Sequence, residues 1–211
     1  LAARAGVVAW APESLDGHCC GLSLASKGFA DEAHELLEKA VLALYAVSDR
    51  GRLPIVIDAS SCTYTFRQGE KLRGDALEAW EALTFLDVSE FVHDRLLPEL
   101  ELRPVDERVF VHANCASRKL GSDGALLSVA RRCAREARVP DELACCATAG
   151  DRGLLFPELS ESALKREKAE LEAGEYQRFV SSNLTCETGL SAQLGRRFTS
   201  FLYLVDAASS P

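Results

Sequence analysis

The stretch "RFVSSNLTCETGLSAQLGR", residues 178–196, contains the elements that decide the fold of this chain. Its first six residues, 178–183, predict a short buried strand, and "CETGLSAQLGR" predicts a short helix. Cys186 stands at the junction between the two. A strand followed by a cysteine and then a helix places a thiol where the strand ends.

A similar stretch occurs in the first half of the chain. "LPIVIDAS", residues 53–60, predicts a buried strand, and Cys62 follows it in "SCTY". A double cysteine precedes each stretch, in "HCCGLSLASKGF" and in "ACCATAGDRGLLF". The separation is 42 residues from Cys20 to Cys62 and 40 residues from Cys146 to Cys186. This recurrence predicts a duplication, with one repeat over 1–104 and a second over 105–211.

The remaining segments alternate between apolar runs and amphipathic patterns. Such alternation predicts an α/β fold of two pseudo-repeated βαβ units, with short parallel sheets flanked by helices and cysteines at the C-terminal ends of strands. The predicted strands are 6–12, 53–60, 108–114, 142–146 and 178–183. The predicted helices are 31–49, 74–100 (broken near 87–89 and stopped by Pro98), 122–139, 159–174 and the one that begins at Cys186. The charged run "ESALKREKAELEAGE", residues 161–175, predicts the exposed face of a helix.

Composition excludes several classes of protein. The net charge of −8, from 32 acidic and 24 basic residues, argues against a nucleic-acid or anionic-membrane surface. No apolar run approaches the roughly 20 residues of a membrane span, and no signal peptide is recognisable. The sequence contains no Met, and we expect it to be part of a longer protein. The expected location is the cytoplasm, peripheral to the inner face of the membrane.

Eight cysteines are many for a chain with long Ala-, Leu- and Glu-rich helical stretches. A secreted disulfide scaffold is typically smaller and loop-rich, so reduced thiols for metal or redox chemistry are the better interpretation. Since the carboxyl ends of parallel strands meet at one edge of a sheet, thiols from several strand ends can converge there. Four thiolates select zinc or an iron–sulfur cluster. The absence of a close C-x(2–4)-C pair favours iron–sulfur.

The second repeat contains one more cysteine, Cys115, which lies 30 residues before Cys145. The counterpart of Cys115 in the first repeat is expected upstream of Leu1. The sequence therefore predicts one complete site, made of Cys115, Cys145, Cys146 and Cys186, and one incomplete site, made of Cys19, Cys20 and Cys62.

Other interpretations of these residues stay open. Any single cysteine can be a small core residue, which is the preferred interpretation of Cys133, and the adjacent pairs could form vicinal disulfides. Histidines beside the ligand loops could be ligands or ordinary loop and core residues. Cations after the cysteines, Lys27 among them, could tune a cluster or simply face solvent. The predicted neighbours of the site are His18, His112, Arg118 and Arg152.

Three segments carry a family resemblance: "HCCGLSLASKGF", "CCATAGDRGLLFPELSESAL" and "SSNLTCETGLSAQLGRRFTSFLYLVDAA". Together they resemble the C-terminal cysteine-rich, CCG-repeat region of bacterial FAD-linked D-lactate dehydrogenases. The repeat is also similar to those of the glycolate oxidase iron–sulfur subunit, the anaerobic glycerol-3-phosphate dehydrogenase small subunit and the CCG-repeat subunit of heterodisulfide reductase. The resemblance covers nearly the whole chain.

The resemblance implies an electron-transfer role. The expected cofactor is an iron–sulfur cluster of the 4Fe-4S type, with FAD in upstream domains of a D-2-hydroxy-acid dehydrogenase. The expected partners are that flavin domain and a quinone, cytochrome or other electron acceptor. No catalytic residue is assigned within the chain, which has neither a Rossmann nor a P-loop glycine pattern.

The sequence departs from the family pattern at three positions. Ala59 and Asn183 stand where the first cysteine of each C-x-x-C element is expected, and Ala147 replaces the glycine of the second "CCG". These changes argue against a five-cysteine noncubane cluster and leave four-cysteine ligation available. The alternatives are an interaction or scaffold domain that holds zinc or no cluster, and heterodisulfide-type thiol reduction at a cluster.

Overall fold

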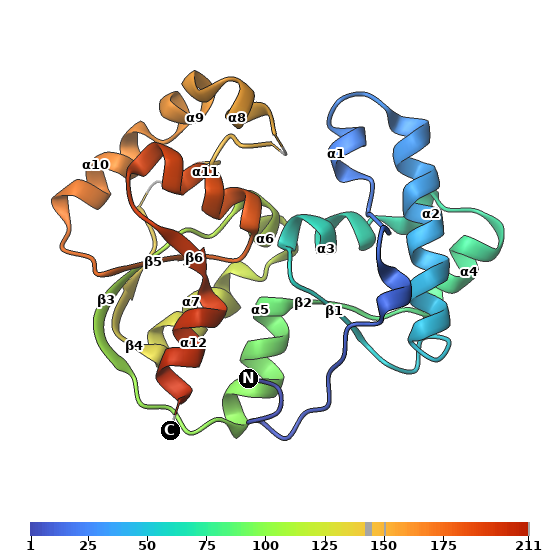
Figure 1. The fold of residues 1–211 in the computed structure, drawn as a ribbon, viewed down its shortest axis with the longest axis horizontal. Coiled ribbons are helices and arrows are strands. Elements are labelled where there is room, and N and C mark those ends of the chain that lie inside the picture. Colours follow the sequence, from blue (N-terminus) through green and yellow to red (C-terminus); the bar gives the residue numbers. More distant parts are fainter. Residues whose placement is uncertain (142–144, 150, 211) are drawn as a thin grey trace. The chain divides into compact units, whose positions relative to one another are not determined.

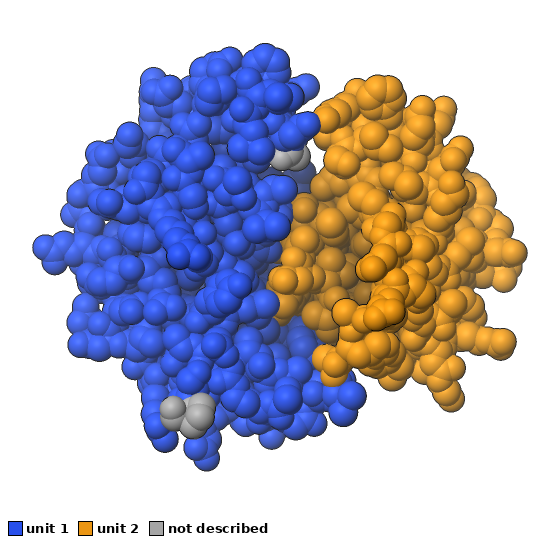
Figure 2. Space-filling model, in the orientation of Figure 1, with its two compact units in different colours: residues 1–8, 89–211 blue, residues 9–88 orange. Residues whose placement is uncertain are grey.

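The structure, a computed structural model, describes residues 1–141, 145–149 and 151–210. The chain forms two compact units, shown in different colours in Figure 2. The smaller unit comprises residues 9–88, and the larger comprises residues 1–8 and 89–211. None of the helices in the described part of the chain is long and apolar enough to cross a bilayer.

The larger unit is built on a four-stranded parallel sheet (Figure 1). The strands lie in the order β4-β3-β5-β6. On β3, the consecutive residues Val109, Phe110 and Val111 are all buried. Because neighbouring strand residues point to opposite faces, the sheet is covered on both sides, as expected of a parallel sheet. The strand bounds are β3 Val105–Val111, β4 Ala134–Arg138, β5 Arg178–Ser181 and β6 Phe198–Ser200.

The chain winds away from the centre of this sheet in two directions. From β3 it passes through α6 (Cys115–Leu120) and α7 (Asp123–Cys133) to the edge strand β4. From β5 it passes through α11 (Leu184–Leu194) to the opposite edge, β6, and ends in α12 (Phe201–Ser209). The winding direction therefore reverses between β3 and β5. In open α/β sheets, ligands bind outside the carboxyl ends of the strands at such a switch point.

Between β4 and β5 the described residues form three helices, and the last of them contributes Leu171 to the core of the larger unit. They are α8 (Arg152–Leu155), α9 (Pro157–Ala163) and α10 (Lys165–Ala173). Phe110 is central to this core, with its ring centroid 5.1 Å from that of Tyr176 and 6.2 Å from that of Phe198. The same cluster of buried residues contains Cys146 and Cys186. Two of the candidate ligands are thus part of the packed core.

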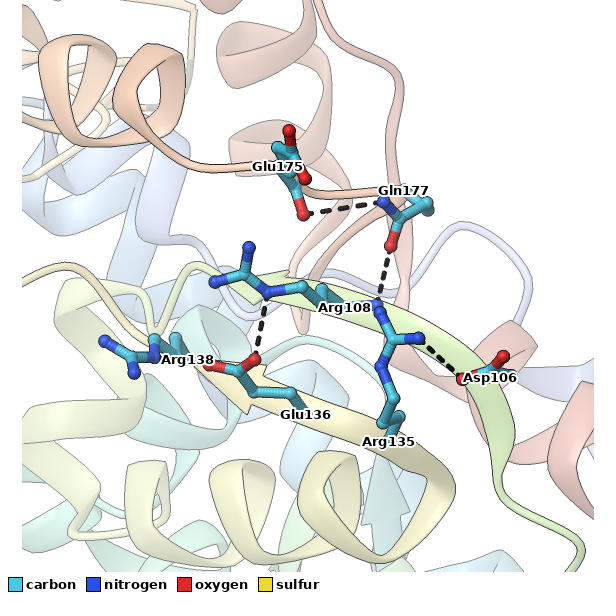
Figure 3. A network of polar contacts seen from close by, with 7 residues as sticks. All are labelled: Asp106, Arg108, Arg135, Glu136, Arg138, Glu175 and Gln177. Atoms are coloured by element: carbon cyan, nitrogen blue, oxygen red, sulfur yellow. Dashed lines mark hydrogen bonds and ion pairs between the residues drawn. The ribbon is translucent and has the colours of Figure 1, made fainter.

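Ion pairs between side chains connect neighbouring strands of the sheet (Figure 3). Arg108 Nε lies 2.9 Å from Glu136 Oε2, which connects β3 with β4. The backbone N–H of Arg108 donates to the side-chain oxygen of Gln177 at 2.8 Å. A further pair, Arg178 with Glu107 at 2.6 Å, connects β5 with β3.

The segment that enters the larger unit packs against α7. It consists of α5 (Val88–Phe91), a π-helical turn (Val92–Leu96) and a 3-10 turn (Leu97–Glu99). Ser89 Oγ donates to the carbonyl of Ser122 at 3.3 Å, and His93 Nε2 lies 3.1 Å from Ser128 Oγ.

The smaller unit contains a two-stranded parallel sheet and a helical layer. β1 (Ile55–Ile57) pairs with β2 (Phe85–Asp87), and Ile55 lies opposite Phe85. Its core includes buried side chains from α2, α3 and α4, with Cys20 among them. The helices are α1 (Leu22–Ala25), α2 (Ala30–Val47), α3 (Ser60–Phe66) and α4 (Gly74–Ala82), with 3-10 turns at Glu13–Leu15 and Gly69–Lys71.

The predicted α/β class, with short parallel sheets flanked by helices, is confirmed. The predicted strand over 6–12 is wrong, because residues 7–12 form no strand and the side chains of Val8 and Trp10 are exposed. β-branched residues form a strand only where a neighbouring strand pairs with them, and this segment joins one unit to the other. Of the predicted strand 142–146, residues 142–144 lie outside the described residues, and Cys145 and Cys146 lie in a loop.

Two predicted helices each contain a strand instead of continuing. β2 lies within the predicted helix 74–100, and β4 forms the end of the predicted helix 122–139. Short apolar runs do not distinguish a buried strand from a helix by periodicity alone. The repeat boundaries 1–104 and 105–211 remain a prediction.

Candidate metal centre

Cys115 lies at the start of α6, just beyond the carboxyl end of β3. The side chain of Asn114 caps this helix by accepting hydrogen bonds from the N–H groups of Ala116 and Ser117, both at 3.0 Å. Such a cap fixes the helix start. The Cys115 thiol is therefore held on the first turn, and it is exposed.

Cys186 is the third residue of α11, beyond the carboxyl end of β5. Its Sγ lies 3.2 Å from the Sγ of Cys146, and both side chains are buried. β3 and β5 are neighbours at the switch point of the sheet. The two strand ends thus bring Cys115 and Cys186 to the edge where ligands of open α/β sheets bind.

The loop that contains Cys145 and Cys146 donates hydrogen bonds to the sulfur atoms of these two residues. The N–H of Ala147 donates to Cys145 Sγ at 3.4 Å, and Thr148 Oγ1 donates to Cys146 Sγ at 3.2 Å. Ala147 adopts a φ of 54°, in the left-handed region. A glycine in α11, Gly189, allows the close approach of this loop, since a Cβ there would lie 2.2 Å from Thr148 Oγ1.

The four thiols of the larger unit influence one another's protonation. A hydrogen bond with Cys145 raises the pKa of Cys115. Hydrogen bonds with Cys115 and Cys146 lower the pKa of Cys145. Hydrogen bonds with Cys145 and Cys186 raise the pKa of Cys146. Cys146 and Cys186 are therefore in direct contact, and Cys115 and Cys145 lie close enough to influence the protonation of this pair and of each other.

Four cysteine thiols are a donor set that an iron–sulfur cluster can use. Among the residues that the structure describes, no three His, Cys, Asp or Glu side chains are arranged to hold a single metal ion. An iron–sulfur cluster of four irons takes four cysteines, so its ligands surround a cluster and need not converge on one point. All eight cysteines are free thiols, and the adjacent pairs form no vicinal disulfide.

The smaller unit repeats this arrangement with three thiols. Cys62 is the third residue of α3, and its Sγ lies 3.4 Å from that of Cys20. The N–H of Gly21 donates to Cys19 Sγ at 3.4 Å, and Gly21 has a φ of 79°. A hydrogen bond with Cys20 lowers the pKa of Cys62 to about 7. The structure brings Cys20 and Cys62 into contact, and Cys19 lies within electrostatic range of Cys62.

The predicted neighbours of the site differ in their positions. His18, Arg118 and Arg152 are exposed, whereas His112 is completely buried. A cation that the sequence interpretation missed is Lys119, whose charge lowers the pKa of Cys115. Cys133 lies buried at the end of α7, where burial raises its pKa to about 11.

A second missed residue is Glu167 of α10, which accompanies His112. Its carboxylate oxygen Oε1 lies 2.7 Å from His112 Nδ1, and neither side chain is exposed. The prediction of an exposed helix face over 161–175 is wrong at this residue. A single acidic residue in a charged run gives no signal of burial, because its partner lies 55 residues away.

Comparison with known proteins relates the chain to a curated protein. No protein-family model matches the chain. The chain is similar to the glycolate oxidase iron–sulfur subunit of Escherichia coli (strain K12), with 27% identity over 188 residues. The match covers 82% of this chain and 44% of the relative, so the chain spans less than half of that protein's length.

Proposed function

We propose that this chain is an iron–sulfur electron-transfer domain whose cluster is held by Cys115, Cys145, Cys146 and Cys186. The observation that carries the proposal is the contact of Cys146 Sγ with Cys186 Sγ at 3.2 Å, together with the positions of Cys115 and Cys186 at the switch point of the larger sheet. Support also comes from the similarity to a protein named as an iron–sulfur subunit. Ligation by four cysteines is that of a 4Fe-4S cluster.

The parent enzyme in this proposal is a flavin-linked dehydrogenase of D-2-hydroxy acids such as D-lactate. In this proposal, FAD would lie in another part of the protein or in a partner subunit. Electrons would pass from the reduced flavin through this domain to a quinone, a cytochrome or another carrier. The proposed location is the cytoplasm, at the inner face of the membrane.

When bound, the cluster supplies one-electron transfer, and the residues of this chain hold it and set its surroundings. The N–H of Ala147 and the hydroxyl of Thr148 donate to the sulfurs of Cys145 and Cys146. Such hydrogen bonds stabilise thiolate charge and tune the potential of a cluster. Burial of Cys146 and Cys186 keeps water from one side of the site. The exposed thiols, Cys115 and Cys145, define the side that faces solvent.

The thiols of the smaller unit, Cys19, Cys20 and Cys62, form an incomplete site in this proposal. Residues 1–104 contain no counterpart of Cys115, so three thiols are available to this site and not four. We therefore expect one cluster per chain, in the larger unit.

Anaerobic reconstitution of the chain with iron and sulfide tests the proposal. The expected product contains labile sulfide and has a visible chromophore that dithionite bleaches. Stoichiometric zinc without sulfide would instead support the scaffold alternative, and a colourless, sulfide-free product would contradict the proposal. Turnover of a heterodisulfide by the reduced chain would favour the thiol-reductase alternative.

A further inference from the structure

His112 and Glu167 form a buried polar pair whose hydrogen bonding is incomplete. The Nδ1 of His112 lies 2.7 Å from Oε1 of Glu167. The remaining polar atoms, Nε2 of His112 and Oε2 of Glu167, are buried and have no hydrogen-bond partner among the described residues. A buried polar atom without a partner costs about 1–3 kcal/mol. Such an atom in a folded protein calls for a bound group that completes its hydrogen bonding.

The imidazole of His112 lies on the side of the sheet that contains the thiols. The strand pairing of β3 continues through His112, whose N–H donates to the carbonyl of Val180 at 2.9 Å. Because strand side chains alternate, His112 shares a face with Phe110. Phe110 packs in the same core as Cys146 and Cys186.

Electrostatics gives a second, independent indication of this position. The charge of His112 acts on the thiol of Cys145, where it favours the thiolate. The imidazole is therefore within electrostatic range of the Cys145 thiol.

The number of protons on the His112–Glu167 pair determines whether Nε2 of His112 donates or accepts a hydrogen bond. With one proton between Nδ1 and the carboxylate and a second on Nε2, the His112–Glu167 pair is neutral as a whole. With only one proton, the pair would bury a net negative charge beside four thiolates, which is costly. The neutral pair presents an N–H at Nε2, which is a donor and not a lone pair.

We propose that Nε2–H of His112 donates a hydrogen bond to a sulfur of the cluster, and that Glu167 is the positioning residue that holds the ring for this contact. The inference rests on the proposed function, since it needs a cluster at the four thiols. Hydrogen bonds to cluster sulfurs raise the reduction potential. The pair would therefore make the cluster an easier electron acceptor.

The test uses the reconstituted chain labelled with 15N-histidine and reduced with dithionite. Pulsed electron–nuclear double resonance should detect a weakly coupled histidine nitrogen and an exchangeable proton. Both should persist when the other three histidines, His18, His34 and His93, are replaced by Gln, because none of these is buried. A strong nitrogen coupling would make His112 an iron ligand and would overturn the proposal.

Reduction potentials provide the second measurement. His112→Leu should reduce the equilibrium constant for cluster reduction by roughly tenfold, which corresponds to about 59 mV for one electron. His112→Gln, which keeps an N–H donor, should recover part of this loss. Glu167→Leu should lower the potential, whereas Glu167→Gln, which can still orient the ring, should stay near the wild type. His93→Gln, the matched control, should leave the potential unchanged.

The outcomes separate the two proposals. A cluster that forms normally but shows no coupled histidine proton would contradict the role of His112 alone. Unchanged potentials in folded His112→Leu and Glu167→Leu variants would contradict it equally. A chain that binds no iron and sulfide would contradict the proposed function, and the role of His112 with it.

Discussion

At the scale of single residues, one backbone conformation recurs in both double-cysteine loops. Gly21 and Ala147 follow the cysteine pairs, have φ values of 79° and 54°, and donate their N–H groups to the first sulfur of each pair. The left-handed conformation costs an L-residue roughly 1–2 kcal/mol. The second loop therefore keeps the fold of the first in spite of its alanine.

Ala147→Gly should raise the free energy of unfolding by about 1 kcal/mol, because glycine removes the strain but gains entropy in the unfolded chain. Denaturant unfolding of both proteins measures the difference. Gly21→Ala, the reverse change in the other loop, should destabilise the chain, since the new Cβ would lie 2.3 Å from the carbonyl oxygen of Ala33. An Ala147→Gly protein less stable than the wild type would contradict this account.

Cys133 is the thiol that we assign to packing alone. Cys133→Ala should keep the full content of labile sulfide after reconstitution and lower the free energy of unfolding by about 1 kcal/mol, since it removes a small buried group. Loss of the chromophore in this variant would show that the thiol has a role at the metal centre.

At the scale of secondary-structure elements, the contact between α11 and the second cysteine loop is the tightest constraint on the site. Gly189→Ala would place a Cβ 2.2 Å from Thr148 Oγ1 and displace this hydroxyl from its hydrogen bond to Cys146 Sγ. We expect lower cluster content, measured as iron and labile sulfide per chain. The matched control is Gly124→Ala in α7, where a Cβ meets nothing within 4 Å. That variant should keep its cluster and gain up to about 1 kcal/mol from helix propensity.

Arg178 and Glu107 tie β5 to β3 in a pH-dependent way. The hydrogen bond from Arg178 lowers the pKa of Glu107. A carboxyl with a lowered folded-state pKa adds stability above its unfolded-state pKa, and this stability is lost as the pH falls through the folded-state value. Arg178→Gln should therefore cost up to about 1 kcal/mol at pH 7 and nothing in strong acid, as measured by unfolding. A pH-independent difference would contradict this prediction.

The sequence was sufficient to predict some elements and not others. The 31–49 helix has a long apolar period and appears as α2, and the runs before Cys62, Cys115 and Cys186 appear as β1, β3 and β5. β2 and β4 were missed because each directly adjoins a helix and is at most five residues long. Their strand conformation depends on pairing with β1 and β3, which is tertiary information.

The same limit applies to the site. The recurring spacing predicted which thiols would meet, and the structure brings Cys20 into contact with Cys62 and Cys146 into contact with Cys186. The pairing of His112 with Glu167 was not predictable, because nothing in the sequence connects a residue after β3 with one residue of a charged helix.

At the scale of the whole molecule, each unit contains a β–α–β element with a cysteine at the third helical position. Cys62 and Cys186 hold these positions, and each lies within 3.4 Å of the second cysteine of a pair. The larger unit adds β3 and β4, and with β3 comes Cys115. Each unit thus has its own copy of this arrangement of a cysteine pair and a helix cysteine. The larger unit has a fourth thiol, Cys115.

Reconstitution of Cys186→Ser and Cys62→Ser, side by side with the wild type, tests the central claim most directly. Iron and labile sulfide per chain are measured in each protein under anaerobic conditions. The account predicts one four-iron cluster in the wild type and in Cys62→Ser, and none in Cys186→Ser. Equal cluster content in Cys186→Ser and the wild type would contradict it.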